Sequence, residues 1–362
     1  MAMTSSGRAP WWSWAWPLMA WVVLLLGAVV GAHGVLDALA GAALIATVFA
    51  AVYHAEVVAH RVGEPFGTIV LAVAVTVIEV ALIVSLMLAP TLDKSGLARD
   101  TVFAAVMIVC NGVVGLCLLA GGARHREQGF QVAGASAALA VLAALTVLSL
   151  VLPGYTTSAP GPFFSTSQMV FAGIASLVLY VSFIFVQTVR HRDYFLPLEG
   201  TGTDEHAAPP SNRAAWTSLG LLLVCLVAVV ALAKSLTPML DAGVAWLQAP
   251  KAASGVVIAT LVLLPEGLSA LKAARANRLQ TSLNLALGSA LATIGLTIPA
   301  VVAVSLWLHQ PLELGLGPKE QLLLALTLFI GVITLGTGRT TVLQGVVHLA
   351  IFATFMFLSV VP

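Results

Sequence analysis

Charged side chains are scarce in this 362-residue chain, where 9% of the residues are Asp, Glu, Lys or Arg and 60% are hydrophobic. A soluble domain typically carries roughly 25% charged residues. The composition therefore excludes a soluble protein and predicts a polytopic membrane protein whose main partner is the lipid bilayer. The net charge of +1 gives no basis for expecting a nucleic-acid partner.

Cofactor and nucleotide motifs are also missing. The three cysteines, Cys110, Cys117 and Cys225, lie in apolar runs without metal-binding spacing, so we expect small buried thiols. No GxxxxGK[ST] phosphate-binding motif occurs, so we expect neither a bound nucleotide nor another cofactor. The N-terminus combines a tryptophan-rich stretch with a long apolar run, which favours a retained first span over a signal peptide.

Apolar runs that are long enough to cross a bilayer, which needs about 20 residues, dominate the rest of the chain. We predict an all-α bundle of about eleven transmembrane helices at 15–33, 35–60, 65–89, 99–122, 129–152, 167–190, 214–235, 252–273, 281–306, 318–336 and 339–361. The seventh run is expected to continue toward Leu247 with an interruption near Pro238. A polar, acidic linker divides the chain into halves. The predicted parts are an N-terminal tail and extra helix (1–34), a first five-helix repeat (35–190), the linker (191–213) and a second five-helix repeat (214–362).

The distribution of Lys and Arg predicts the orientation. With eleven spans, one side of the membrane receives Arg8, Arg61, Arg124, Arg126, Arg190, Arg192, Arg213, Lys272, Arg275, Arg278 and Arg339. The other side receives Lys94, Arg99, Lys234, Lys251 and Lys319. The excess of basic residues on the first side places the N-terminus in the cytoplasm and the C-terminus outside, in a bacterial cytoplasmic membrane.

Two acidic residues occupy matching positions in the two halves. Gly67 aligns with Ser254, and without a gap Glu79 then aligns with Glu266. An odd number of spans per half inverts the second half relative to the first, which predicts an inverted-topology repeat. A charged side chain at bilayer depth costs about 2.5–3.5 kcal/mol on insertion scales. We therefore expect Glu79 and Glu266 to meet at a central ion site.

Electrostatics allows such a site two states. Two bare carboxylates in a low dielectric repel each other, so either both are protonated or a divalent cation lies between them. If only these neutral states exchange access between the two sides, cation and protons move in opposite directions. Oxygen ligands favour a hard cation such as Ca²⁺, which takes about six to eight of them. The alternative interpretation is structural, with each acid bonded to a neighbouring helix.

Further oxygen ligands are available on the same and adjacent helices. The candidate cation-binding residues beside the two acids are Thr76, Thr260, Ser289, Asn111 and Asn284. Pro265 removes a helical hydrogen bond and frees a backbone carbonyl near Leu261. The hydroxyls have an alternative role in bonding their own backbone, and the asparagines have one in holding helices together.

A proton path is predicted at the cytoplasmic end of the second span. Its candidates are Glu56, His54 and Glu64, with a solvated helix end as the alternative. His348 and Gln344, four residues apart, are interpreted as a satisfied buried pair.

Small residues and the linker complete these expectations. Gly67, Gly115, Gly288 and Gly295 are expected to let helices pack closely. The acidic linker is interpreted as a flexible solvated loop rather than a Ca²⁺ sensor.

Two stretches resemble the signature repeats of the cation/Ca²⁺ exchanger superfamily, and in particular its bacterial ChaA-type antiporters. They are GEPFGTIVLAVAVTVIEVALIV (Gly63–Val84) and LLPEGLSALKAARANRLQTSLNLALGSALATIGLTIP (Leu263–Pro299). The layout of eleven spans with an acidic linker after the sixth is similar as well. The resemblance implies that the family's ion-binding acids correspond to Glu79 and Glu266, and its small polar helix to Gly288 and Ser289.

One departure from the family pattern concerns selectivity. Many relatives have Gly-Asn shortly before each acid, where this chain has Val77–Ile78 and Leu264–Pro265. The choice among Ca²⁺, Na⁺ and K⁺ therefore stays open.

The resulting hypothesis is a secondary antiporter that exports cytosolic Ca²⁺ in exchange for protons. The alternatives are a Na⁺/H⁺ or K⁺/H⁺ antiporter of the same fold and a passive cation channel. An enzyme with an acid dyad is disfavoured because no nucleophile or cofactor motif accompanies the two acids.

Overall fold

The computed structural model describes residues 9–30, 34–63, 66–87, 95–197, 210–246, 248, 250 and 252–361. Helices make up nearly all of these residues, which confirms the all-α prediction. Glu64 and most of the acidic linker lie outside the described residues. Backbone contacts divide the chain into two compact units, here called unit 1 (1–94 and 205–248) and unit 2 (95–204 and 249–362).

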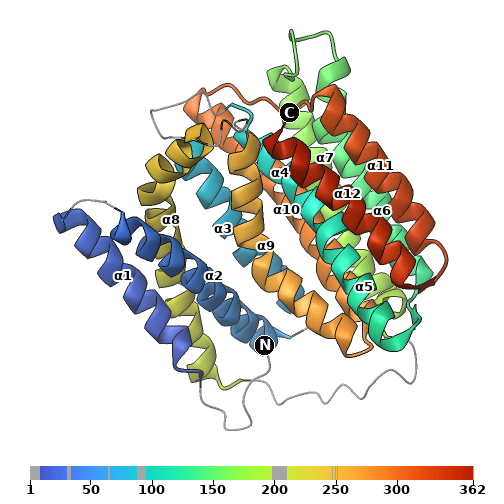
Figure 1. The fold of residues 1–362 in the computed structure, drawn as a ribbon, viewed down its shortest axis with the longest axis horizontal. Helices are drawn as coiled ribbons and strands as arrows, with labels where there is room; N and C mark the ends of the chain where they lie inside the picture. Colours follow the sequence, from blue (N-terminus) through green and yellow to red (C-terminus); the bar gives the residue numbers. More distant parts are fainter. Residues whose placement is uncertain are drawn as a thin grey trace. The chain divides into compact units, whose positions relative to one another are not determined.

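Unit 1 is a four-helix group centred on α2. Its helices are α1 (Trp12–Val30), α2 (Val35–Val62), α3 (Phe66–Met87) and α8 (Asn212–Trp246). Figure 1 shows α2 beside α1 and α8, and α2 and α8 both pack against α3. The α8 helix continues through Pro238, so the predicted interruption there is wrong.

Unit 2 contains the remaining helices. They are α4 (Leu97–Met107), α5 (Val114–His125), α6 (Val132–Thr146), α7 (Thr166–Phe185), α9 (Ala252–Arg275), α10 (Leu279–Leu308), α11 (Pro318–Leu335) and α12 (Val342–Val360). Shorter elements are the π-helical η1 (Ile108–Val113), η2 (Val147–Val151) and η4 (Val186–Arg190), the 3₁₀ turns η3 (Leu152–Tyr155) and η5 (Arg192–Phe195), and the strands β1 (Gln128–Gly129) and β2 (Arg339–Thr340). The η1 segment joins α4 and α5 into one continuous rod.

The lengths of the helices agree with the predicted spans. Within the described residues, ten helical stretches are long and apolar enough to cross a membrane, and α3 adds a shorter apolar stretch, Val70–Ser85. Many of these helices are apolar on all sides, as expected for elements surrounded by other helices and lipid. The three cysteines are free and buried, as predicted.

The loops of unit 2 gather at two opposite ends. At one end β1 pairs with β2, and Gln128 Nε2 donates to Asn277 Oδ1 at 3.0 Å. At the other end the backbone N–H of Glu313 donates to the carbonyl of Ser95 at 3.0 Å. Successive loops therefore alternate between the ends, as an up-and-down helical membrane protein requires.

Close helix packing occurs at three of the four predicted glycines. A Cβ atom at Gly67 would lie 2.5 Å from the carbonyl oxygen of Ala59, and one at Gly295 would lie 2.6 Å from Tyr180 Cβ. At Gly115 it would lie 3.0 Å from the Leu349 side chain. The prediction for Gly288 is wrong because, apart from the neighbouring backbone of α10, no heavy atom of the described residues lies within 4 Å of the Cβ position.

Candidate cation and proton site

Glu79 lies in the middle of α3, where its side chain is only 2% exposed. The flanking residues Ile78 and Leu82 are buried as well, and Thr76 is buried one turn earlier on the same side of the helix. The helix that carries Glu79, α3, belongs to unit 1, where it packs against α2 and α8. A carboxyl group at this depth needs either a proton or a cation to be neutral.

Glu266 lies in the C-terminal half of α9, and both of its carboxylate oxygens are buried. The helix continues through Pro265, which cannot supply the N–H for the carbonyl of Leu261. A Cβ atom at the next residue, Gly267, would lie 3.2 Å from Val113 at the end of η1. Glu266 therefore belongs to unit 2, beside the contact between α9 and η1.

The two acids lie in different units, so their predicted meeting stays a prediction. Thr76, His54 and Glu56 share unit 1 with Glu79. The other candidates share unit 2 with Glu266, namely Thr260, Ser289, Asn111 and Asn284. Among the residues that the structure describes, no three His, Cys, Asp or Glu side chains form a group that could hold a metal ion.

The hydroxyl candidates differ in their surroundings. Thr260 Oγ1 donates to the carbonyl of Val256 at 2.7 Å, the backbone bond considered as its alternative role. Its oxygen keeps lone pairs for another partner. Ser289 is half-buried on α10, nearly three turns after the start of the helix, and Thr293 one turn later is buried.

Both asparagine candidates hold neighbouring segments together. Asn111, fully buried in η1, donates from Nδ2 to Thr327 Oγ1 on α11 at 2.9 Å. Asn284 on α10 donates from Nδ2 to the carbonyl of Phe195 at 2.6 Å. Their predicted role as cation ligands stays a prediction, while their part in helix packing is visible.

Of the proton-path candidates, His54 does not lie at a solvated helix end. His54 is 1% exposed, and its Nε2 donates to the carbonyl of Ser13 on α1 at 2.9 Å. Its Nδ1 lies 3.2 Å from the hydroxyl of Ser218 on α8. Glu56 is half-buried, and Glu64 lies outside the described residues. His54 thus connects three helices of unit 1 at the point where the sequence suggested an open route.

The expected pairing of His348 with Gln344 is wrong. Gln344 caps the start of α12, where its side chain accepts from the backbone N–H of Thr341 at 2.9 Å. His348 is buried, as expected, but its partners are Asn111 at 3.2 Å and Thr334 at 3.2 Å. The i to i+4 spacing in the sequence gave no sign of partners on η1 and α11.

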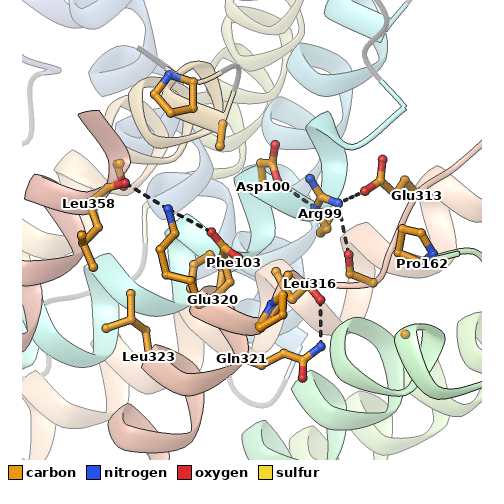
Figure 2. Close-up of a pocket in the computed structure, with 18 of the residues that line it drawn as sticks. Arg99, Asp100, Phe103, Pro162, Glu313, Leu316, Glu320, Gln321, Leu323 and Leu358 are labelled. Carbon is orange, nitrogen blue, oxygen red and sulfur yellow. Dashed lines mark hydrogen bonds and ion pairs between the residues drawn. The ribbon is translucent and has the colours of Figure 1, made fainter. Parts of the chain in front are cut away.

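A cavity with charged side chains lies at one end of unit 2 and was not predicted from the sequence. Figure 2 shows Arg99 on α4 between the carboxylates of Asp100 and Glu313. The cavity holds about 700 Å³ and also borders Glu320 and Val256. Arg99 and Asp100 are adjacent at the start of a predicted span, and this unusual pair was the only sequence signal.

The α9 wall of this cavity leads toward Glu266. Val256 precedes Glu266 by ten residues on the same helix, which corresponds to about 15 Å. The carboxylates of Asp100, Glu313 and Glu320 line the cavity at the end of unit 2 where α9 begins.

Comparison with known proteins extends this picture. The chain is 54% identical over 99% of its length to a putative ionic transporter, y4hA, from Sinorhizobium fredii, and covers 98% of that protein. It is 36% identical over 86% of its length to the sodium-potassium/proton antiporter ChaA of Escherichia coli, of which 85% is covered.

A solved structure shows the same fold. The structure of native YfkE superimposes with a TM-score of 0.75 at 16% identity, covering 97% of this chain and 100% of YfkE. YfkE is described as a Ca²⁺/H⁺ antiporter protein. This likeness confirms the cation/Ca²⁺ exchanger fold.

The family match covers both halves of the chain. Residues 32–189 and 217–361 each match the sodium/calcium exchanger protein family. The relatives are transporters and not enzymes. With two buried acids at matching positions in an exchanger fold, the chain belongs to the sodium/calcium exchanger protein family and is a multi-pass membrane antiporter of the cation/Ca²⁺ exchanger type.

Proposed function

We propose that this antiporter exports cytosolic Ca²⁺ in exchange for protons, with Glu79 and Glu266 as the groups that bind either cation or proton. The observation that carries the proposal is the burial of both carboxyl groups at matching positions in two halves that match one family. Bilayer-depth carboxyl groups that served only packing would have no reason to recur at the same position in both halves.

The charges of the transported ions explain how the movement of Ca²⁺ is coupled to the movement of protons. Two ionised carboxylates carry a charge of −2, which one Ca²⁺ or two protons neutralise. A buried charge is strongly disfavoured without a partner, so release of the cation favours protonation, and release of the protons favours cation binding. Competition for the same two carboxylates therefore couples the opposing fluxes without any other energy source.

Hydroxyl, amide and backbone oxygens are expected to complete the shell of the cation. Thr76 precedes Glu79 by one turn on α3, and Thr260 precedes Glu266 by six residues on α9. The carbonyl of Leu261 lacks its helical donor because of Pro265. Ser289, Asn111 and Asn284 are the remaining candidates. Such mixed oxygen ligands suit Ca²⁺.

The direction of transport follows from the proposed topology. We place the protein in the bacterial cytoplasmic membrane, with the N-terminus in the cytoplasm and the C-terminus outside. The excess of Lys and Arg on the N-terminal side supports this orientation. An inward proton gradient then drives the cation outward.

A second candidate is exchange of Na⁺ or K⁺ for protons. It is favoured by the 36% identity with ChaA, which is named a sodium-potassium/proton antiporter. A monovalent ion would need only one ionised carboxylate, with the other protonated. The two candidates therefore differ in the number of protons exchanged per cation.

The test uses everted membrane vesicles with an imposed pH gradient. Ca²⁺, Na⁺ and K⁺ are added separately to wild type, Glu79→Gln, Glu266→Gln and Glu127→Gln. Glu127 is the matched control, because its carboxylate is half exposed and paired with Arg339 at the protein surface. We expect Ca²⁺ to collapse the gradient in wild type and in the control, and in neither of the other two variants.

Each other outcome has a distinct meaning. Collapse by Na⁺ or K⁺ alone would replace Ca²⁺ by the second candidate. Cation flux that leaves the pH gradient intact would indicate a passive channel. Full activity of Glu79→Gln and Glu266→Gln would refute the role of the two acids.

A further inference from the structure

The π-helical turn η1 lies between the Glu266 helix and α12. On one side, a Cβ atom at Gly267 would lie 3.2 Å from Val113, the last residue of η1. On the other side, a Cβ atom at Gly112 of η1 would lie 3.2 Å from the Phe352 ring on α12. The absence of side chains at Gly267 and Gly112 allows these close approaches. The end of η1 therefore packs directly against the residue that follows Glu266.

A buried hydrogen-bond chain fixes η1 in place. It runs from Thr327 on α11 through Asn111 on η1 and His348 on α12 to Thr334 on α11. All four side chains are at least 96% buried. π-helical turns are rare in proteins overall but frequent at functional sites. A side chain that fixes such a turn is therefore a candidate functional residue.

The donors and acceptors of this chain can be assigned. The Thr327 hydroxyl donates to the carbonyl of Leu323 at 2.8 Å, a better acceptor than the sulfur of Met107 at 3.4 Å. Its oxygen therefore accepts from Asn111 Nδ2, which turns Asn111 Oδ1 toward His348.

The assignment of His348 follows. Because Asn111 Oδ1 can only accept, His348 Nδ1 carries the hydrogen and donates. His348 Nε2 is then left to accept from the hydroxyl of Thr334. Every polar atom of the chain is satisfied with a neutral imidazole in one tautomer, so the histidine acts here as a fixed double hydrogen-bonding group.

We propose that His348 is a positioning residue for cation binding. Through Asn111 it ties η1 to α11 and α12, and η1 in turn packs against Gly267 beside Glu266. This inference rests on the proposed function, in which Glu266 binds the cation. Loss of the histidine leaves Asn111 Oδ1 buried without its donor and lets η1 relax, which lowers the affinity for the cation more than the maximal rate.

The experiment measures proton-coupled cation exchange in everted vesicles for His348→Leu and His348→Gln. Gln can donate to Asn111 and accept from Thr334, whereas Leu can do neither. Thr354→Val is the matched control on α12, because its exposed hydroxyl donates within the same helix, to the carbonyl of Ala350. The amount of each variant in the membrane is measured in parallel.

We expect His348→Leu to raise the half-saturating cation concentration about tenfold, with a maximal rate within about threefold of wild type. His348→Gln and Thr354→Val should stay within about twofold of wild type, with an unchanged pH profile. If the Leu variant does not reach the membrane, Thr334→Val, which removes only the hydroxyl, should raise the half-saturating concentration about threefold.

Two results would overturn the proposal. Wild-type affinity in His348→Leu or, where that variant is absent, in Thr334→Val would show that the chain does not position the site. Equal loss in the Gln and Leu variants with a shifted pH profile would show that His348 carries a proton instead. A wild type that exchanges none of the three cations would refute the proposed function itself, a failure visible before any variant is compared.

Discussion

A single methyl group at Gly295 should separate two helices of unit 2. A Cβ atom at this position of α10 would lie 2.6 Å from Cβ and 2.8 Å from Cγ of Tyr180 on α7. Carbon atoms prefer separations of about 3.5–4.0 Å, so the backbones must move apart by roughly 1 Å. Rotation of the tyrosine ring cannot relieve this clash, because Cβ is fixed to the backbone. Overpacking of this kind costs about 1–3 kcal/mol.

Gly288 on the same helix provides the matched control. In the part of the chain that the structure describes, no heavy atom outside the neighbouring α10 backbone lies within 4 Å of a Cβ atom there. Gly→Ala in a helix gains up to about 1 kcal/mol from helix propensity, and this gain is common to both substitutions. The difference between Gly295→Ala and Gly288→Ala therefore isolates the clash with Tyr180.

The assay is denaturant-induced unfolding of the purified variants in mixed micelles. We expect Gly295→Ala to be less stable than Gly288→Ala by about 1–3 kcal/mol, and Gly288→Ala to be at least as stable as wild type. Equal stability of the two variants would refute the close packing of α7 on α10. A loss of stability confined to Gly288→Ala would show that the close contact of α10 lies at Gly288 and not at Gly295.

Two further predictions concern polar side chains outside the two acids. Arg99→Gln leaves the part-buried carboxylates of Asp100 and Glu313 without their cation, and it should lower the free energy of unfolding by about 1–3 kcal/mol. Lys319→Gln affects a more exposed ion pair and should change the free energy of unfolding by about 0.5 kcal/mol or less. Equal effects of the two substitutions would contradict the arrangement in Figure 2. His54→Leu should weaken the attachment of α1 and lower stability by about 1–2 kcal/mol, while His54→Gln, which can still donate to Ser13, should retain stability and the pH dependence of transport. A pH dependence altered in His54→Gln would instead support the predicted proton path.

The membrane class and the helix count were predictable because both depend on local composition. A run of about 20 apolar residues must form a helix in a bilayer, since no other single segment satisfies its own backbone there. The matching positions of Glu79 and Glu266 were also visible, because a buried acid stands out in an apolar run. Exact boundaries were less accessible, and the continuous path of α8 through Pro238 depended on neighbouring helices.

The partners of the buried polar groups were not predictable. Spacing suggested Gln344 for His348, but the partners lie on η1 and α11, far away in sequence. His54 was placed at a solvated end, yet α1 and α8 enclose it. Gly288 and Gly295 look alike in sequence, and only packing distinguishes the open position from the one against Tyr180.

The sequence by itself determined the class of protein, the membrane spans and the two acids proposed to exchange cation for proton. These features follow from the cost of placing charge and unpaired backbone in lipid, which each segment meets alone. The tertiary structure decided which side chains pair across helices, where glycine is required and how Arg99 pairs with Asp100 and Glu313. Those features depend on contacts between residues that are distant in the chain, and local composition does not predict such contacts.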